Sequence, residues 1–182
     1  IFWIRSDGRF IYVNDSACKS LGYTQGDLET MSVFDIDPCF PEESWGDHWQ
    51  DLKERKSFTL ESTHKRSDGL EFPVEIGVNS LDFNDRQFNV AIARDISERK
   101  KAENALRESE ERFRELTDAL PQVVFEVDVR GTITYANRRA FGLFGYSEAD
   151  LRQGLNTLQM IAEQDHALAA GNIERILRGE TP

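Results

Sequence analysis

Residues 8–28 read GRFIYVNDSACKSLGYTQGDL, and residues 131–151 read GTITYANRRAFGLFGYSEADL. The two segments align without a gap at a constant offset of 123 residues, and 8 of the 21 aligned positions are identical. Solenoid repeats recur every ~20–50 residues, so a period this long indicates a duplicated domain. We therefore predict that the chain contains two copies of one domain.

The first copy of the repeat carries clear local signals. Two β-prone runs, Phe2–Ile4 and Phe10–Val13, flank a turn that ends at Gly8, which predicts a β-hairpin. Asn14 stands where a helix N-cap is expected, and Gly22 stands where a short helix would end. The second copy repeats these signals, so each copy is predicted to begin with two strands followed by short capped helices.

Downstream of the repeat, the first copy continues with a longer helix and three strands. Trp45, Trp49 and Leu52 share one helical face, which predicts a helix over residues 43–54. The middle strand alternates strictly between apolar and polar residues, as a half-buried antiparallel strand does. The predicted strands cover residues 57–66, 70–83 and 87–96, with a turn at Asn84-Asp85 between the last two. This order predicts an α+β fold, a five-stranded antiparallel sheet with helices on one face.

A charged segment follows, which we predict to be an amphipathic helix over residues 97–120. Residues 95–117 carry 13 charged side chains in 23 positions and contain no Gly or Pro. The helix has a heptad seam, formed by Ala102, Leu106, Ser109, Phe113, Leu116 and Leu120. Two interpretations remain open: a solvated single linker helix, or a parallel pair of helices that joins two chains into a homodimer.

The composition excludes several classes of protein. The chain has 182 residues, 39% of them apolar, and a net charge of −11, which is compatible with packed cores and argues against nucleic acid as a partner. No apolar stretch reaches the ~18 residues of a membrane span, and no signal-type segment opens the chain. The two cysteines, Cys18 and Cys39, are too few for a disulfide framework. We expect a soluble, cytoplasmic fragment of a longer protein.

Further motifs complete a recognisable pattern. They are the run Asp7-Gly8-Arg9-Phe10-Ile11-Tyr12-Val13-Asn14 with Ala17 and Leu21-Gly22-Tyr23, the turn Lys65-Arg66-Ser67-Asp68-Gly69, and the run Arg94-Asp95-Ile96-Ser97-Glu98-Arg99-Lys100-Lys101-Ala102-Glu103. In this order and spacing, they resemble two consecutive PAS domains joined by a signalling helix. The last run is similar to the "DITERK…AE" stretch that closes a PAS module and opens its outgoing helix.

The resemblance implies a division of the chain into three parts. The first PAS domain covers residues 1–96 and lacks its N-terminal lead-in, the linker helix covers residues 97–120, and the second copy covers residues 121–182. That second copy aligns with the first only as far as Phe58, so we expect it to lack the last three strands. We expect such a remnant to be ordered by contact with the first domain or a second chain.

Some PAS domains hold haem, flavin or small metabolites between sheet and helices, so the resemblance implies a candidate pocket. Our candidate pocket residues are Trp45, His48, Trp49 and His64. In one interpretation the tryptophans are core aromatics with His48 as a hydrogen-bonded neighbour. In the other they line a cavity, in which His48 orients a small ligand. His64 shares its strand parity with inward apolar residues.

The sequence favours neither haem nor flavin and leaves any ligand unidentified. A flavin photosensor needs an Asn-Cys-Arg-Phe-Leu-Gln stretch, which neither Cys18 nor Cys39 matches. His48 lies on the helix that would carry a haem ligand, but its neighbours reproduce no haem-binding pattern. No metal site is expected, because His48, His64 and His166 are scattered along the chain.

The function implied is sensing and relay, without catalysis. No catalytic triad, phosphate-binding loop or pair of catalytic carboxylates is recognisable, and the expected host is a bacterial or archaeal sensor histidine kinase or, second, a diguanylate cyclase. We expect Arg94, Asp95 and Ile96 to pass a change from the last strand to the outgoing helix and then to an output domain in the same chain. The alternatives are a structural dimerisation module without ligand, and a docking surface marked by an exposed apolar patch on the sheet.

Overall fold

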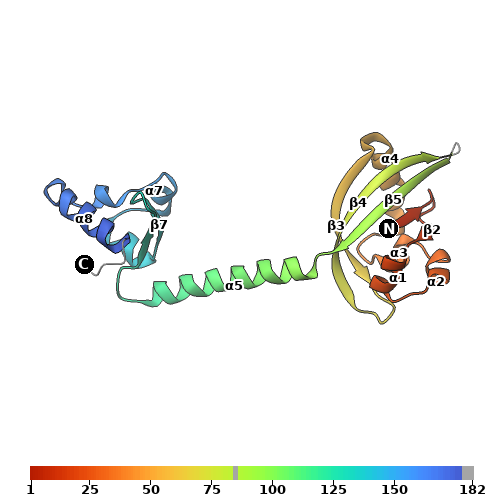
Figure 1. Cartoon of the computed structure of the whole chain (residues 1–182), viewed down its shortest axis with the longest axis horizontal. Helices are drawn as coiled ribbons and strands as arrows, with labels where there is room; N and C mark the ends of the chain where they lie inside the picture. Colours follow the sequence, from red (N-terminus) through yellow and green to blue (C-terminus); the bar gives the residue numbers. More distant parts are fainter. Residues whose placement is uncertain (84–85, 178–182) are drawn as a thin grey trace. The chain divides into compact units, whose positions relative to one another are not determined.

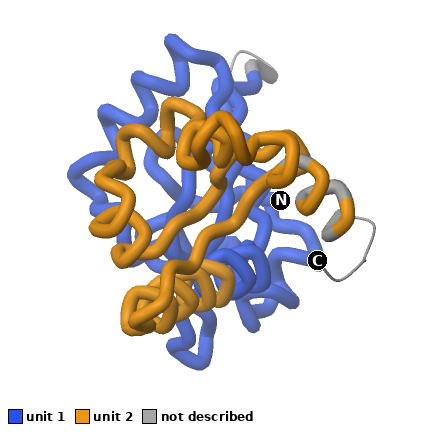
Figure 2. Tube along the Cα trace, turned by 90° about the vertical axis from the view of Figure 1, so that its left-hand side faces the viewer, with its two compact units in different colours: residues 1–104 blue, residues 105–182 orange. Residues whose placement is uncertain are grey.

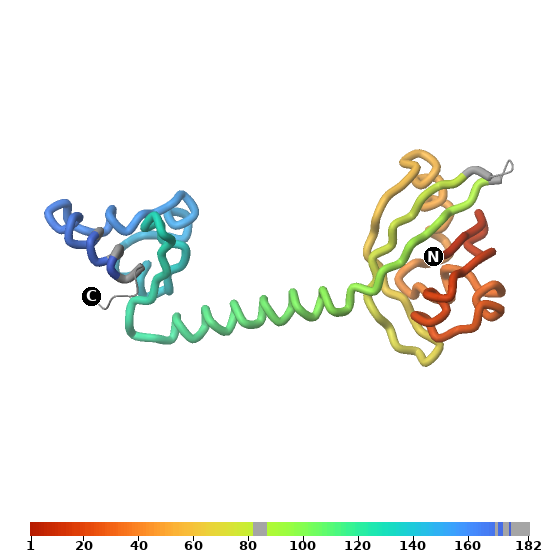
Figure 3. The backbone as a smooth tube through the Cα atoms, viewed as in Figure 1, coloured from red at the N-terminus to blue at the C-terminus, as the bar shows by residue number. Residues whose placement is uncertain are grey.

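The computed structural model describes residues 1–83 and 86–177 of the chain. They form two compact units, residues 1–104 and 105–182, and the boundary falls inside one long helix, α5 (Ser97–Ala119) (Figure 2). The predicted turn at Asn84-Asp85 lies outside the described residues. Helix α5 begins in the first unit and ends in the second (Figure 3).

The first unit is built on the predicted five-stranded sheet (Figure 1). Neighbouring strands are antiparallel and follow the spatial order β2-β1-β5-β4-β3. The hairpin of the first two strands thus joins the edge of a three-stranded meander. The strands are β1 (Phe2–Ile4), β2 (Phe10–Val13), β3 (Ser57–Lys65), β4 (Glu71–Phe83) and β5 (Arg86–Asp95). The prediction of an α+β fold with this sheet is confirmed.

Short helices occupy the chain between β2 and β3. They are α1 (Asp15–Leu21), α2 (Gln25–Glu29), α3 (Val33–Ile36) and α4 (Trp45–Arg55), the last preceded by a 3₁₀ turn at Glu42–Ser44. Asn14 caps α1 as predicted, since its side chain accepts a hydrogen bond from the Ala17 amide at 3.1 Å. The longer helix begins at Trp45 rather than at residue 43, because the residues before it form the 3₁₀ turn.

Gly22, at the end of α1, packs against the turn between β3 and β4. Its backbone has a φ of 74°, the left-handed conformation that glycine adopts without a steric penalty. The Ser67 hydroxyl donates to the Gly22 carbonyl at 2.8 Å, and a Cβ at residue 22 would lie 2.6 Å from that hydroxyl oxygen. The turn motif and the end of the first helix are therefore packed directly against each other.

Strand alternation places the core between the sheet and the helices. In β4 the inward residues Phe72, Val74, Ile76 and Val78 are at most 9% exposed. They pack with buried residues of the hairpin and of the helices in one continuous cluster. This sheet has an inner face under the helices and an outer face, and the candidate site lies on the inner face.

The second unit repeats the start of the first. Its strands β6 (Phe125–Val127) and β7 (Ile133–Ala136) form an antiparallel pair. The helical elements are α6 (Arg138–Phe144), α7 (Glu148–Arg152), α8 (His166–Leu177) and two 3₁₀ turns, Thr157–Met160 and Glu163–Asp165. The repeated cap and stop residues, Asn137 and Gly145, have the same conformations as their partners in the first copy.

Candidate ligand cavity and its connection to the outgoing helix

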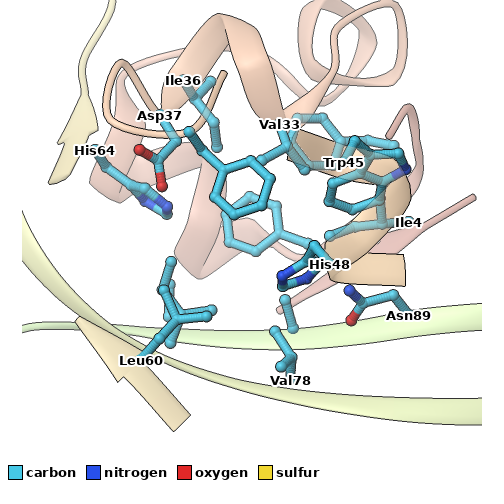
Figure 4. Close-up of a pocket in the computed structure, with 16 residues that line it drawn as sticks. Ile4, Val33, Ile36, Asp37, Trp45, His48, Leu60, His64, Val78 and Asn89 are labelled. Atoms are coloured by element: carbon cyan, nitrogen blue, oxygen red, sulfur yellow. The ribbon is translucent and has the colours of Figure 1, made fainter. Parts of the chain in front are cut away.

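A cavity of about 40 Å³ lies between the inner face of the sheet and the helices of the first unit (Figure 4). Most of its walls are apolar side chains from both layers. Four lining residues are polar: Asp37, which follows α3, His48 on α4, His64 on β3 and Asn89 on β5. Apolar walls with a few convergent polar groups are characteristic of small-molecule sites.

His48 stands in an aromatic environment. Its ring lies 4.9 Å from that of Phe40, 5.1 Å from that of Trp45, which it stacks upon, and 5.3 Å from that of Phe58, between ring centroids. Burial lowers the pKa of His48, and the nearby charge of Asp51 opposes this only partly. His48 is therefore a neutral polar group in the cavity wall.

The two predicted tryptophans have different positions. Trp45 lines the cavity, is 6% exposed, and donates its indole N–H to the Ser6 carbonyl at 2.7 Å. Trp49 is half-buried, lies 6.0 Å from Trp45 between ring centroids, and is not among the residues that line the cavity. Trp45 is thus a fixed wall of the cavity, and Trp49 supports it from behind.

His64 is held between two phenylalanine edges, with its ring centroid 6.0 Å from those of both Phe2 and Phe72. The side chain is 5% exposed, and burial lowers its pKa to about 4. It also lines a crevice on the other side, together with Arg94 and Asp95. His64 therefore lines both the cavity and the crevice that the end of β5 borders.

Two polar residues of the cavity were not predicted from the sequence. Asp37 is 2% exposed; burial raises its pKa, although hydrogen bonds from Ser62 and from the Cys39 and Phe40 amides act in the opposite direction. Asn89 is 1% exposed, and neither its amide nitrogen nor its amide oxygen has a hydrogen-bond partner among the residues that the structure describes. Strand alternation could have indicated Asn89, because it lies on the same face of β5 as Ala91 and Ala93, which also line the cavity.

The predicted relay residues lie where β5 meets α5. Asp95 Oδ1 accepts a hydrogen bond from the Ser97 amide at 2.8 Å, and its Oδ2 lies 3.6 Å from Arg66 Nη2. Burial opposes ionisation of Asp95, but the hydrogen bonds from Ser97 and the charges of Arg66 and Lys101 together lower its pKa. Ile96 is 3% exposed and its amide donates to the Pro73 carbonyl, whereas Arg94 is exposed. Asp95 thus binds the first amide of α5 while it is paired with Arg66 in the turn that follows β3.

A second contact fastens the first turn of α5 to the outer face of the sheet. Arg99 Nη2 lies 2.8 Å from Glu61 Oε1 on β3, and its Nη1 lies 3.2 Å from Glu75 Oε2 on β4. Lys100 Nζ lies 2.6 Å from the other oxygen of Glu61. Glu61 and Glu75 are directly paired across the two strands, so both cations meet one acidic site. We call these four residues the helix clamp.

The other end of α5 is fastened within the second unit. Asn137 is fully buried; its side-chain amide donates to the Thr117 carbonyl at 2.8 Å, and its oxygen caps α6 through the Ala140 amide. Asp118 Oδ1 accepts from the Arg138 amide at 2.6 Å. The capping asparagine of the repeat therefore also binds the end of the linker helix.

The predicted heptad seam is exposed along α5. Leu106, Phe113, Leu116 and Leu120 are 62%, 44%, 64% and 45% exposed, and Ala102 and Ser109 are exposed too. Phe113 lies 5.3 Å from Tyr135 between ring centroids, so it is partly covered by its own chain. Within the described ranges there is no group of three or more potential metal ligands, and no helix that is long and apolar enough to span a membrane.

Comparison with known families agrees with this architecture. Residues 1–98 and residues 111–178 each match a PAS domain family. The chain therefore belongs to the PAS family and carries two PAS domains in tandem.

Among curated proteins, the chain is 28% identical over 138 residues to sporulation kinase E of Bacillus subtilis (strain 168). The match covers 76% of this chain and 18% of that kinase, so the chain spans less than a fifth of its relative's length.

A solved structure shows the same fold. A PAS domain of an HTR-like protein from Haloarcula marismortui is 24% identical, with a TM-score of 0.50, over 52% of this chain and 78% of that one. A PAS domain from a two-component sensor histidine kinase is 25% identical, with a TM-score of 0.45, over 52% of this chain and 81% of that one.

Proposed function

We propose that this chain is the sensory and relay part of a multidomain signalling protein. In this proposal the first PAS domain binds a small ligand in its cavity, and α5 passes the resulting change to an output domain in the same chain. Similarity to a sporulation kinase supports a histidine kinase as that output domain. The two PAS domains themselves are proposed to be non-catalytic.

The observation that carries the proposal is the path of β5. Asn89, Ala91 and Ala93 of this strand line the cavity, and the strand ends at Asp95, which caps α5. A ligand that favours one packing of the helices on the sheet would shift β5 and hence the start of α5. The ligand biases the output only by its difference in affinity for the two packings.

We further propose that α5 acts in a homodimer. Its apolar seam is exposed at heptad spacing, and a second α5 would cover it in a parallel coiled coil. About three heptads with alanine and serine in the seam give weak association alone, so the attached domains would supply the rest. A change in rotation or register of such a pair is a signal that an output domain can read.

A location in the cytoplasm is part of the proposal. It is supported by the two free cysteines, of which Cys39 is exposed, because reducing compartments keep thiols in this form. Haem and flavin are not part of the proposal.

A second candidate function is a dimerisation module without a ligand. It is favoured by an outer-face patch on the sheet, formed by Trp3, Tyr12, Phe88 and Ile92. Trp3 lies 6.4 Å from Tyr12 and 6.1 Å from Phe88 between ring centroids, and Tyr12 and Ile92 are 45% and 52% exposed. Apolar side chains gathered on an exposed sheet face are typical of interfaces.

Native mass spectrometry of the freshly purified chain separates the two candidates. A small molecule that copurifies, and whose removal changes hydrogen exchange in the first turns of α5, supports the sensor. An empty cavity in every preparation, together with a stable dimer, supports the structural module and contradicts the sensor.

A further inference from the structure

The side chain of Asn89 is an unpaired polar group in the cavity wall. It is 1% exposed, and neither its Nδ2 nor its Oδ1 has a hydrogen-bond partner in the described part of the chain. An amide buried without partners is costly, and the large majority of buried side-chain polar atoms in native proteins are paired. In Figure 4 the Asn89 side chain lies on the sheet side of the space between sheet and helices, which His48 also lines. The Asn89 amide therefore offers the cavity one hydrogen-bond donor and one acceptor that have no partner among the described residues.

The charges around the cavity disfavour a charged ligand. None of the described residues that line it is Lys or Arg, and burial lowers the pKa of both His48 and His64, so an anion would find no counter-charge there. Asp37 is the one acidic lining residue, and it already accepts hydrogen bonds from Ser62 and from the Cys39 and Phe40 amides. A cation would have to compete with these bonds.

The size of the cavity limits the ligand further. A buried water requires about 10–15 Å³ on the scale on which this cavity measures about 40 Å³. The space is therefore that of about three waters, or of a molecule with a similar number of heavy atoms.

We propose that this cavity binds an uncharged molecule of about three to four heavy atoms that carries a hydrogen-bond acceptor and donor side by side, as a small carboxamide does, and that Asn89 pairs with both. The inference rests on the proposed function, because it names the class of ligand for the sensor cavity. Asn89 would then set specificity, while the aromatic side chains Phe40, Trp45 and His48 enclose the apolar part of the ligand.

Four molecules of nearly equal shape provide the test: acetamide, acetone, acetate and acetamidinium. They differ in hydrogen bonding and charge, and each is titrated into the isotope-labelled full chain while amide signals are followed by NMR. Acetamide should bind at least ~5-fold more tightly than acetone, because acetone lacks the donor for Asn89 Oδ1. Acetate and acetamidinium should give no saturable shifts of cavity residues.

Two variants assign the selectivity to Asn89. Asn89→Leu should weaken acetamide binding by about 10-fold and acetone binding by less, because acetamide loses two hydrogen bonds and acetone loses one. It should also raise the melting temperature of the unliganded first unit, since it removes an unpaired buried amide. The matched control is Asn79→Leu, the same change at an exposed position of β4, which should leave both affinities unchanged. If leucine at residue 89 prevents folding, Asn89→Val replaces it.

The inference is overturned if acetone or either ion binds as tightly as acetamide, or if Asn89→Leu leaves the ratio of acetamide to acetone affinity unchanged. It is also overturned if a copurifying molecule of another chemical class fills the cavity, although the sensor function would then stand. Conversely, acetamide binding without any change of exchange in α5 would support the ligand class and contradict the relay.

Discussion

Arg99, in the first turn of α5, lies 2.8 Å from the carboxylate of Glu61 on the outer face of the sheet. The same guanidinium reaches Glu75, and Lys100 shares Glu61, so the start of the linker helix is held by a helix clamp to two adjacent strands. On the inner face, the same two strands line the cavity through Leu60 and Ile76. In each strand the residue that lines the cavity is directly next to the glutamate of the helix clamp. The clamp therefore connects the cavity wall with the start of α5.

Neutralising the clamp should loosen the start of α5 without unfolding the sheet. In Glu61→Gln, both Arg99 and Lys100 lose their shared carboxylate, and we expect hydrogen exchange in the first two turns of α5 to accelerate by a few-fold. The effect should shrink at high salt, because the pairs are exposed. Glu108→Gln, on the same helix but away from the clamp, is the control. Unchanged exchange in Glu61→Gln would show that the clamp does not hold the helix.

Asp95 has two roles that substitutions can separate. Asp95→Ala removes both the helix cap and the pair with Arg66, and should cost about 1 kcal/mol and fray the start of α5. Asp95→Asn retains the cap and loses only the charge. We expect both variants to fold and Asp95→Ala to abolish signal-dependent activity of the full-length protein. Normal signalling by Asp95→Ala would exclude Asp95 as a relay residue.

His64 should make the first unit less stable in mild acid. Folding lowers the pKa of His64 from an ordinary 6.5 to about 4. Between these two pH values the imidazole is protonated in the unfolded chain and neutral in the folded chain. Stability is therefore fully present above pH 6.5 and falls as the pH drops to about 4, by ~3 kcal/mol in total. The raised pKa of Asp37 acts in the opposite direction near the acidic end of this range.

Tryptophan fluorescence isolates this effect, because all three tryptophans, Trp3, Trp45 and Trp49, lie in the first unit. The free energy of unfolding in urea, measured at several pH values, should fall steeply with decreasing pH for the wild type and less steeply for His64→Gln. His166→Gln, in the second unit, is the control. Equal slopes for wild type and His64→Gln would contradict the assignment.

The seam of α5 should decide the oligomeric state. Leu106→Lys places a charge on each helix at the centre of the proposed coiled coil, and we expect the dimer dissociation constant to rise at least ~10-fold. Arg107→Glu, one residue outside the seam, should leave it nearly unchanged. Sedimentation velocity at several protein concentrations measures the dimer dissociation constant of each variant. A monomeric wild type would contradict the proposed dimer.

Two glycines should respond in opposite ways to the same change. Gly22→Ala should destabilise the first unit by about 1–2 kcal/mol, because φ is 74° and the added Cβ would lie 2.6 Å from Ser67 Oγ. Gly46 lies at an exposed position of α4, with open space where a Cβ would be added. Gly46→Ala should therefore stabilise the first unit by up to ~1 kcal/mol. Thermal melts followed by tryptophan fluorescence compare the two. Similar losses in both variants would remove the argument for a strained Gly22.

Much of this protein is determined by its sequence alone. The repeat, the strand alternation and the caps at Asn14 and Asn137 depend on neighbouring residues, so they predicted the elements and the α+β fold. The sequence motifs supplied the resemblance to PAS domains. The tertiary structure decided what depends on distant partners. The Trp45 indole binds the Ser6 carbonyl 39 residues away, Arg99 reaches Glu61 across 38 residues, and Asn89 is left without a partner. No local pattern encodes such pairings, because they depend on which side chains the packed layers bring within hydrogen-bonding distance.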